Sequence, residues 1–145
     1  MVKQLNKPFL EEQIELIYLS WKTVSRVKNK VGMMSFEKMF YRSPRLRKMF
    51  SGDLNGSVKR LMVMLEATVH NLDEWENVEY IIQSLAEDYH RYGLQAKDFK
   101  KWERSVLWGL YKAMGNDWND ILRQSWEELL GRIRKQMISH IKTLK

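Results

Sequence analysis

The stretch Phe50-Ser-Gly-Asp-Leu-Asn-Gly-Ser-Val-Lys-Arg-Leu-Met62 decides the fold more than any other part of the sequence. It holds two turn signals, Ser51-Gly52-Asp53 and Asn55-Gly56, because glycine and short polar residues favour tight turns. From about Ser57 to Leu72 the apolar residues recur at helical spacing, which predicts a helix. The turn signals therefore separate this helix from a short one before it.

Outward from this stretch, the same periodicity predicts helices along almost the whole chain. Ser43-Pro44 precedes the short helix, and Gly93 and Gly115 are placed to end two later ones. No segment alternates with period two for long enough to predict a strand. We therefore expect an all-α fold of about seven helices after a flexible tail at residues 1–8. The expected helices cover about 9–24, 31–40, a short stretch after Pro44, about 57–72, 76–93, 97–114 and 118–142.

The composition excludes several classes of protein. The 145 residues include no cysteine and three histidines, His70, His90 and His140, with no two at metal-ligand spacing. A disulfide framework and a thiolate nucleophile are excluded, and a multi-histidine metal site is not expected. The sequence has no apolar run of 18 residues and no secretory signal, so we expect a cytoplasmic chain without a membrane span.

The net charge of +7 raises the question of a nucleic-acid partner. The basic residues are spread over the chain, however, and their densest cluster, Arg42, Arg45, Arg47 and Lys48, is typical of a solvated helix face. We therefore expect no nucleic-acid partner. We also expect no enzyme, because the paired carboxylates have no base or nucleophile beside them.

The pattern resembles the globin family, and in particular its single-domain bacterial members, over nearly the whole chain. The turn and helix start at Phe50–Met62 are similar to theirs, and Leu85-Ala-Glu-Asp-Tyr-His-Arg-Tyr-Gly93 resembles their proximal-helix motif. Pro44 precedes Phe50 as the proline of the short globin helix precedes its haem-stacking phenylalanine. The resemblance implies a globin fold, with three helices packed over three, in one globin-like domain at 1–145.

The resemblance also implies a haem b cofactor and a pocket for it. Phe50 would stack on the porphyrin, Leu61 would overhang its distal side, and Phe36 would point at the iron-bound ligand. Ser57 takes the distal hydrogen-bonding position, although it is equally placed to cap its helix. Trp102 stands where a smaller aliphatic residue usually faces the haem, and such extra bulk costs about 1–3 kcal/mol unless something else leaves.

The proximal motif departs from the family at one position. The globin proximal histidine lies four residues before the glycine that ends its helix, and this position holds Tyr89, whereas His90 is one residue late. Helical geometry agrees, because Tyr89 falls within the apolar stripe and His90 is rotated by about 100° from Tyr89. Three outcomes stay open: Tyr89 ligates the iron as a phenolate, a π-bulge or early 3₁₀ ending turns His90 inward, or no bond to iron exists.

Two functions of different classes follow from the resemblance. The first is a haem-binding globin that binds, senses or detoxifies oxygen or nitric oxide with an atypical axial ligand; nitric oxide dioxygenation would need an external reductase. The second is a haem-free globin fold that acts as a sensor or protein-interaction module. A third class would bind apolar ligands in the same cavity. If the chain forms a homodimer, the exposed part of residues 97–142 is the expected surface.

Overall fold

The structure is a computed structural model that describes residues 9–144. Seven α-helices account for most of these residues, and no strand occurs among them, which confirms the all-α prediction. The tail expected at residues 1–8 lies outside the described residues. The elements are α2 (Glu11–Ser25), α3 (Lys28–Arg42), α4 (Arg45–Phe50), α5 (Leu54–Val69), the 3₁₀ turn η1 (Trp75–Asn77), α6 (Glu79–Tyr92), α7 (Ala96–Met114), the 3₁₀ turn η2 (Gly115–Asp117) and α8 (Asp120–Ile141).

Local interactions explain where two of the helices begin. Asp53 caps α5, because its Oδ1 accepts a hydrogen bond from the backbone N–H of Gly56 at 3.1 Å. The expectation that Ser57 caps this helix is therefore wrong, since the turn aspartate supplies the cap one turn earlier. The helix expected from about residue 76 begins instead at Glu79, because Trp75–Asn77 forms the turn η1.

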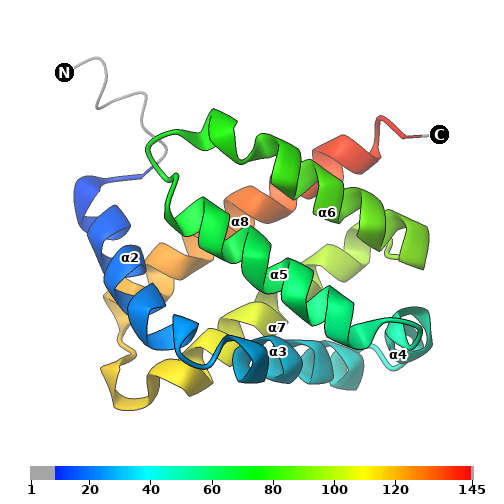
Figure 1. Cartoon of the computed structure of the whole chain (residues 1–145), viewed down its shortest axis with the longest axis horizontal. Helices are drawn as coiled ribbons and strands as arrows, with labels where there is room; N and C mark the ends of the chain where they lie inside the picture. The colour runs from blue at the N-terminus through cyan, green and yellow to red at the C-terminus, as the bar shows by residue number, and fades with distance from the viewer. Residues whose placement is uncertain (1–8, 145) are drawn as a thin grey trace.

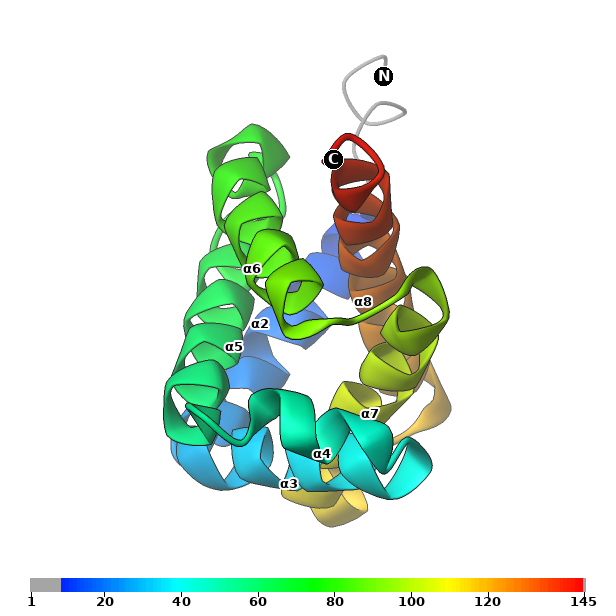
Figure 2. The same ribbon diagram turned by 90° about the vertical axis from the view of Figure 1, so that its right-hand side faces the viewer.

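The helices surround one core. Figures 1 and 2 show α5 and α6 on one side and α7 and α8 on the other, with α3 and α4 along one end. The most extensive helix pairing is that of α3 with α7. It depends on Gly109, where a Cβ would stand 2.4 Å from Ser35 Oγ and 3.2 Å from the Val31 carbonyl oxygen. The absence of a side chain at Gly109 therefore lets α7 pack directly against α3.

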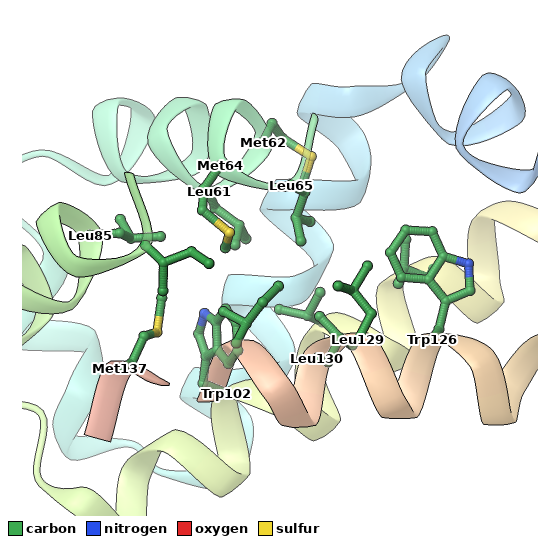
Figure 3. Packing of buried hydrophobic residues seen from close by; sticks show 14 of the residues in the cluster. Leu61, Met62, Met64, Leu65, Leu85, Trp102, Trp126, Leu129, Leu130 and Met137 are labelled. Carbon is green, nitrogen blue, oxygen red and sulfur yellow. The ribbon is translucent and has the colours of Figure 1, made fainter. Parts of the chain in front are cut away.

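Buried tryptophans mark the two ends of the core. Figure 3 shows Trp102 of α7 pointing into the space near Leu61 and Met64 of α5, whereas Trp126 of α8 lies at the other end of the cluster. Trp102 is 1% exposed and Trp126 is 0% exposed. The end that holds Trp102 lies between α5, α6 and α7, and the predicted site residues lie there.

Candidate functional site

Tyr89 and Trp102 meet in the interior between α6 and α7. Nε1 of Trp102 donates a hydrogen bond to the Tyr89 hydroxyl at 3.3 Å, and the two ring centroids lie 6.4 Å apart in an edge-on contact. Each side chain belongs to a residue that is only 1% exposed. Trp102 therefore turns inward, and it meets the residue at the predicted proximal position.

Further aromatic rings surround this pair. The ring of Phe50 lies 5.8 Å from that of Tyr89, and 5.1 Å from those of Phe36 and Tyr92. On the other side of Tyr89, the ring of Phe99 lies at 6.2 Å. Edge-on and tilted contacts of this kind are the arrangements that aromatic rings prefer. Most of the predicted site residues therefore share one buried aromatic cluster.

The cluster leaves little free space. The void beside it holds about 150 Å³ of space between atoms, and it admits no sphere of the size of water. Pockets for cofactors and drug-sized ligands measure ~300–1,000 Å³. The lining of the void includes two of the predicted pocket residues, Phe36 and Leu61, together with Ser35, Met39, Trp102, Ser105 and Val106. The interior is packed with the side chains of the chain itself.

The phenol of Tyr89 is held in its neutral form. Burial raises its pKa far above the ordinary value of 10.0, and the hydrogen bond from Trp102 opposes that rise only in part. At neutral pH the hydroxyl therefore keeps its proton. A phenolate ligand, the first of the three outcomes that the sequence leaves open, would require the loss of this proton.

Helix α6 sets the register of the proximal residues. It is α-helical from Glu79 to Tyr92 and contains no π-bulge. It ends at Gly93, whose φ of +105° favours glycine, and the N–H of Gly93 bonds to the carbonyls of Tyr89 and His90. In this register Tyr89 is buried and His90 is exposed. The alternative in which a π-bulge or an early 3₁₀ ending turns His90 inward is not observed.

Arg60 is a site residue that sequence reasoning missed. Its Nη2 donates to the Tyr92 hydroxyl at 3.0 Å and to Ser57 Oγ at 3.3 Å. Its buried Nε lies 3.3 Å from Asp88 Oδ2, a charge contact rather than a well-aligned hydrogen bond. Arg60 thereby ties α5 to α6 beside the aromatic cluster, and the buried Ser57 is engaged with it. Their spacing of one helical turn within the quoted stretch is the signal that could have paired them.

Part of the basic cluster has internal partners. Arg45 binds Asp98 with both arms, Nη1 to Oδ1 at 2.9 Å and Nη2 to Oδ2 at 2.5 Å, and the Asp98 side chain is fully buried. Burial acts to raise the pKa of Asp98, but the hydrogen bonds from Arg45 and from the Gln95 N–H outweigh it and hold the pKa below its usual range. Arg47 pairs with Glu37 at 3.2 Å. Arg45 therefore ties α4 to α7, whereas the pair of Arg47 with Glu37 lies on the solvated surface.

Within residues 9–144, no group of three or more histidine, aspartate or glutamate residues is placed to hold a metal ion. No helix in this range combines the length and apolar character needed to cross a membrane.

Solved globin structures share this arrangement of helices. The chain is similar to a hexacoordinated heme protein from an anhydrobiotic tardigrade, with a TM-score of 0.85 and 13% identity over 94% of this chain and 97% of that one. It is also similar to a bacterial globin from Campylobacter jejuni, with a TM-score of 0.81 and 18% identity over 93% and 98% of the two chains. The fold is therefore that of a globin.

Sequence relatives point the same way. The chain is 25% identical to neuroglobin-1 of Oncorhynchus mykiss over 130 residues, which cover 80% of this chain and 82% of the relative. It is 27% identical to a neuroglobin of Dissostichus mawsoni over 133 residues, covering 82% and 84%. No family model matches the sequence. Fold and sequence therefore agree in their similarity to the globin family.

Haem, the cofactor that this family implies, does not fit the interior as the side chains stand. Trp102 and Tyr89 are hydrogen-bonded to each other in the middle of the expected pocket, and the void that remains beside them does not admit even a water molecule. The phenol of Tyr89 is neutral and already accepts a hydrogen bond, while His90 is exposed. The side chains at the expected pocket positions therefore fill the space that a porphyrin would need.

Proposed function

We propose that this chain is a globin-fold domain that works without haem, as a sensor or protein-interaction module. The contact between Tyr89 and Trp102 carries this proposal, because it joins α6 and α7 through the space where the family holds its cofactor. The Phe50 ring packs against Tyr89 instead of standing ready to stack on a porphyrin. The aromatic cluster thus completes the core without a ligand.

The energetics favour this closed interior. Removing a buried tryptophan from its packing costs about 3–5 kcal/mol in typical cores, and an open pocket would sacrifice much of this contact energy for Trp102. If the open form lies about 3 kcal/mol above the closed form in free energy, less than about 1% of the molecules are open. A ligand that enters must therefore supply binding free energy beyond that difference.

The proposed role is not enzymatic. The groups buried at the site are a neutral phenol, an indole, apolar side chains and serine hydroxyls, and two of these hydroxyls donate to backbone carbonyls. None of these groups is a base or an activated nucleophile. Globin relatives support a protein that acts by binding.

Absorption spectroscopy with hemin tests the proposal. The spectrum is recorded for the protein as purified, after hemin is added in stoichiometric amounts, and after reduction under carbon monoxide. We expect no specific Soret band from the wild-type chain. The double variant Tyr89→His/Trp102→Val, which supplies room and an axial imidazole, is expected to develop one. A stoichiometric Soret band from the wild-type chain would overturn the proposal.

A haem-binding globin for diatomic gases is the second candidate function. Its support is the similarity to neuroglobins and, in fold, to a hexacoordinated heme protein. In that case the cofactor is haem b, the ligand is oxygen or nitric oxide, and Tyr89 and Trp102 must separate. The visible bands of a hemin complex would then distinguish histidine from tyrosinate ligation, with Tyr89→Phe and His90→Ala as the discriminating variants.

A further inference from the structure

The outer side of α7 carries a continuous basic and aromatic stripe. Its members fall within about 120° of arc and extend for about 22 Å along the helix. The two acidic residues of α7 lie off the stripe: Asp98 is buried against Arg45, and Glu103 pairs with Arg134 at 2.5 Å. The stripe consists of Lys97, Lys100, Lys101, Arg104, Trp108, Tyr111 and Lys112.

Helix α3 widens this stripe into a face. Lys38 Nζ lies 4.8 Å from the ring centroid of Trp108 and 5.2 Å from that of Tyr41, and Lys112 Nζ lies 5.8 Å from Trp108. Such cation–π contacts hold the ammonium groups beside the rings. Tyr41 is 78% exposed and Tyr111 is 46% exposed. We name the stripe together with Lys38 and Tyr41 the α7 basic face.

The cations of the α7 basic face form no salt bridges among the described residues. Across residues 9–144, every salt bridge falls on other side chains, although the charge of Lys101 helps to lower the pKa of Asp98. The cations that lie outside these salt bridges are Lys38, Lys97, Lys100, Lys101, Arg104 and Lys112. The neighbouring Arg45 and Arg47, by contrast, are paired. Unpaired charges of one sign repel each other and attract a surface of the opposite sign.

We propose that the α7 basic face docks an acidic segment of a partner protein, one that presents carboxylates around an apolar ridge. Tyr41, Trp108 and Tyr111 would form the centre of the contact, and the lysines its rim, which is the usual anatomy of protein interfaces. The span of about 22 Å matches an acidic helix of about four turns.

The same features disfavour a nucleic acid as the occupant. Proteins bind single strands in grooves with free aromatic faces for the bases, whereas this face is the convex side of a helix. In addition, the Trp108 ring already has Lys38 and Lys112 beside it.

The inference builds on the proposed function, since a domain without a cofactor acts through its surface. Its test is separate, however, because no residue of the α7 basic face lines the void beside Tyr89. Hemin titration examines the interior and peptide binding examines the surface, so either idea can fail while the other stands.

Fluorescence anisotropy with a labelled synthetic peptide tests the proposal. The probe is an amphipathic helix of about 16 residues with glutamates flanking a leucine ridge, titrated with the full chain at about 0.15 M salt. The triple variant Lys97→Glu/Lys100→Glu/Arg104→Glu is expected to bind about tenfold more weakly or worse. The matched control Lys59→Glu/Lys135→Glu/Lys142→Glu makes the same change in net charge elsewhere on the surface and is expected to bind like the wild type.

A second pair of variants tests the aromatic centre. Tyr41→Ala is expected to weaken peptide binding about threefold to tenfold. Tyr80→Ala removes a tyrosine of equal exposure, 79%, from α6 and is expected to change nothing. Circular dichroism spectra of all variants serve as the control that the helices are kept.

Several results would overturn the proposal. One is equal weakening in the two triple variants, which would indicate attraction by net charge alone. Another is absence of peptide binding by the wild-type chain. A third is tighter binding of a single-stranded oligonucleotide or of phosphatidylserine vesicles than of the peptide, which would assign the face to a nucleic acid or to a membrane surface.

Discussion

The two ends of the core both bury a tryptophan, but they hold it in different ways. Trp126 Nε1 donates to Ser20 Oγ at 2.9 Å, and Ser20 donates in turn to the Ile17 carbonyl at 2.9 Å, so the chain of hydrogen bonds ends on the backbone. Trp102 Nε1 donates over 3.3 Å to the Tyr89 side chain. The first end is anchored to the backbone of helix α2, whereas the second is closed by a longer hydrogen bond between two side chains. We therefore expect a ligand or a mutation to open the Tyr89 end more readily than the Trp126 end.

The largest effect is expected at the anchored end. Trp126→Ala should lower the free energy of unfolding by about 3–5 kcal/mol, because it leaves a cavity and removes the hydrogen bond to Ser20. Urea denaturation followed by circular dichroism measures the change. A loss below about 1 kcal/mol would show that the two ends do not differ as described.

A smaller loss with a gain of space is expected at the other end. Trp102→Val should cost about 2–3 kcal/mol in the same assay, since valine keeps part of the packing and the neighbouring rings can relax into the void. The variant should also take up hemin or a small hydrophobic dye more readily than the wild type. Equal uptake by Trp126→Ala would contradict the idea that the Tyr89 end opens more readily.

The ion pair that fixes α4 beside this end predicts a dependence on acid. The pKa of Asp98 is lowered in the folded state, so its stabilising contribution is present above the ordinary carboxyl pKa of 3.8 and is lost as the pH falls through the folded value. Asp98→Asn should lower the free energy of unfolding by about 1–2 kcal/mol at pH 7, a figure that allows for the partial exposure of Arg45. The variant's free energy of unfolding should also change less than that of the wild type as the pH falls. Denaturation between pH 2 and pH 7 measures both, with Asp117→Asn as the control at an exposed aspartate.

The smallest effect is expected for the hydroxyl of Tyr89. Tyr89→Phe should cost about 1 kcal/mol, because the buried Trp102 N–H loses its acceptor. Since the folded pKa of Tyr89 is raised, its contribution is complete below pH 10.0 and is lost as the pH rises above that value, where the unfolded phenol ionises. Above that pH, the melting temperature should therefore fall less steeply with rising pH for the variant than for the wild type. Identical slopes would show that the phenol is not as buried as its contacts indicate.

Local rules account for much of what the sequence predicted. The helices lie close to the expected ranges, because apolar periodicity and punctuation by Gly93 and Pro44 act within one helical turn. The assignment of the cap of α5 to Ser57 failed for a local reason too: Asp53 satisfies the free backbone N–H groups one turn earlier. The contacts of Arg60 with Tyr92 and of Arg45 with Asp98 join different helices, and no spacing within one helix predicts them.

The sequence by itself determined that an unbroken helix ending at Gly93 would turn residue 89 to the core and residue 90 to solvent, because each residue adds a 100° step. The structure decided that the helix is unbroken. The globin arrangement followed from the resemblance of the Phe50–Met62 stretch and the Leu85–Gly93 motif to the globin family. Only the tertiary structure decided what Tyr89 meets. Trp102 belongs to another helix, and the packing of α6 against α7, with the desolvation that follows, makes the two residues partners that fill the pocket.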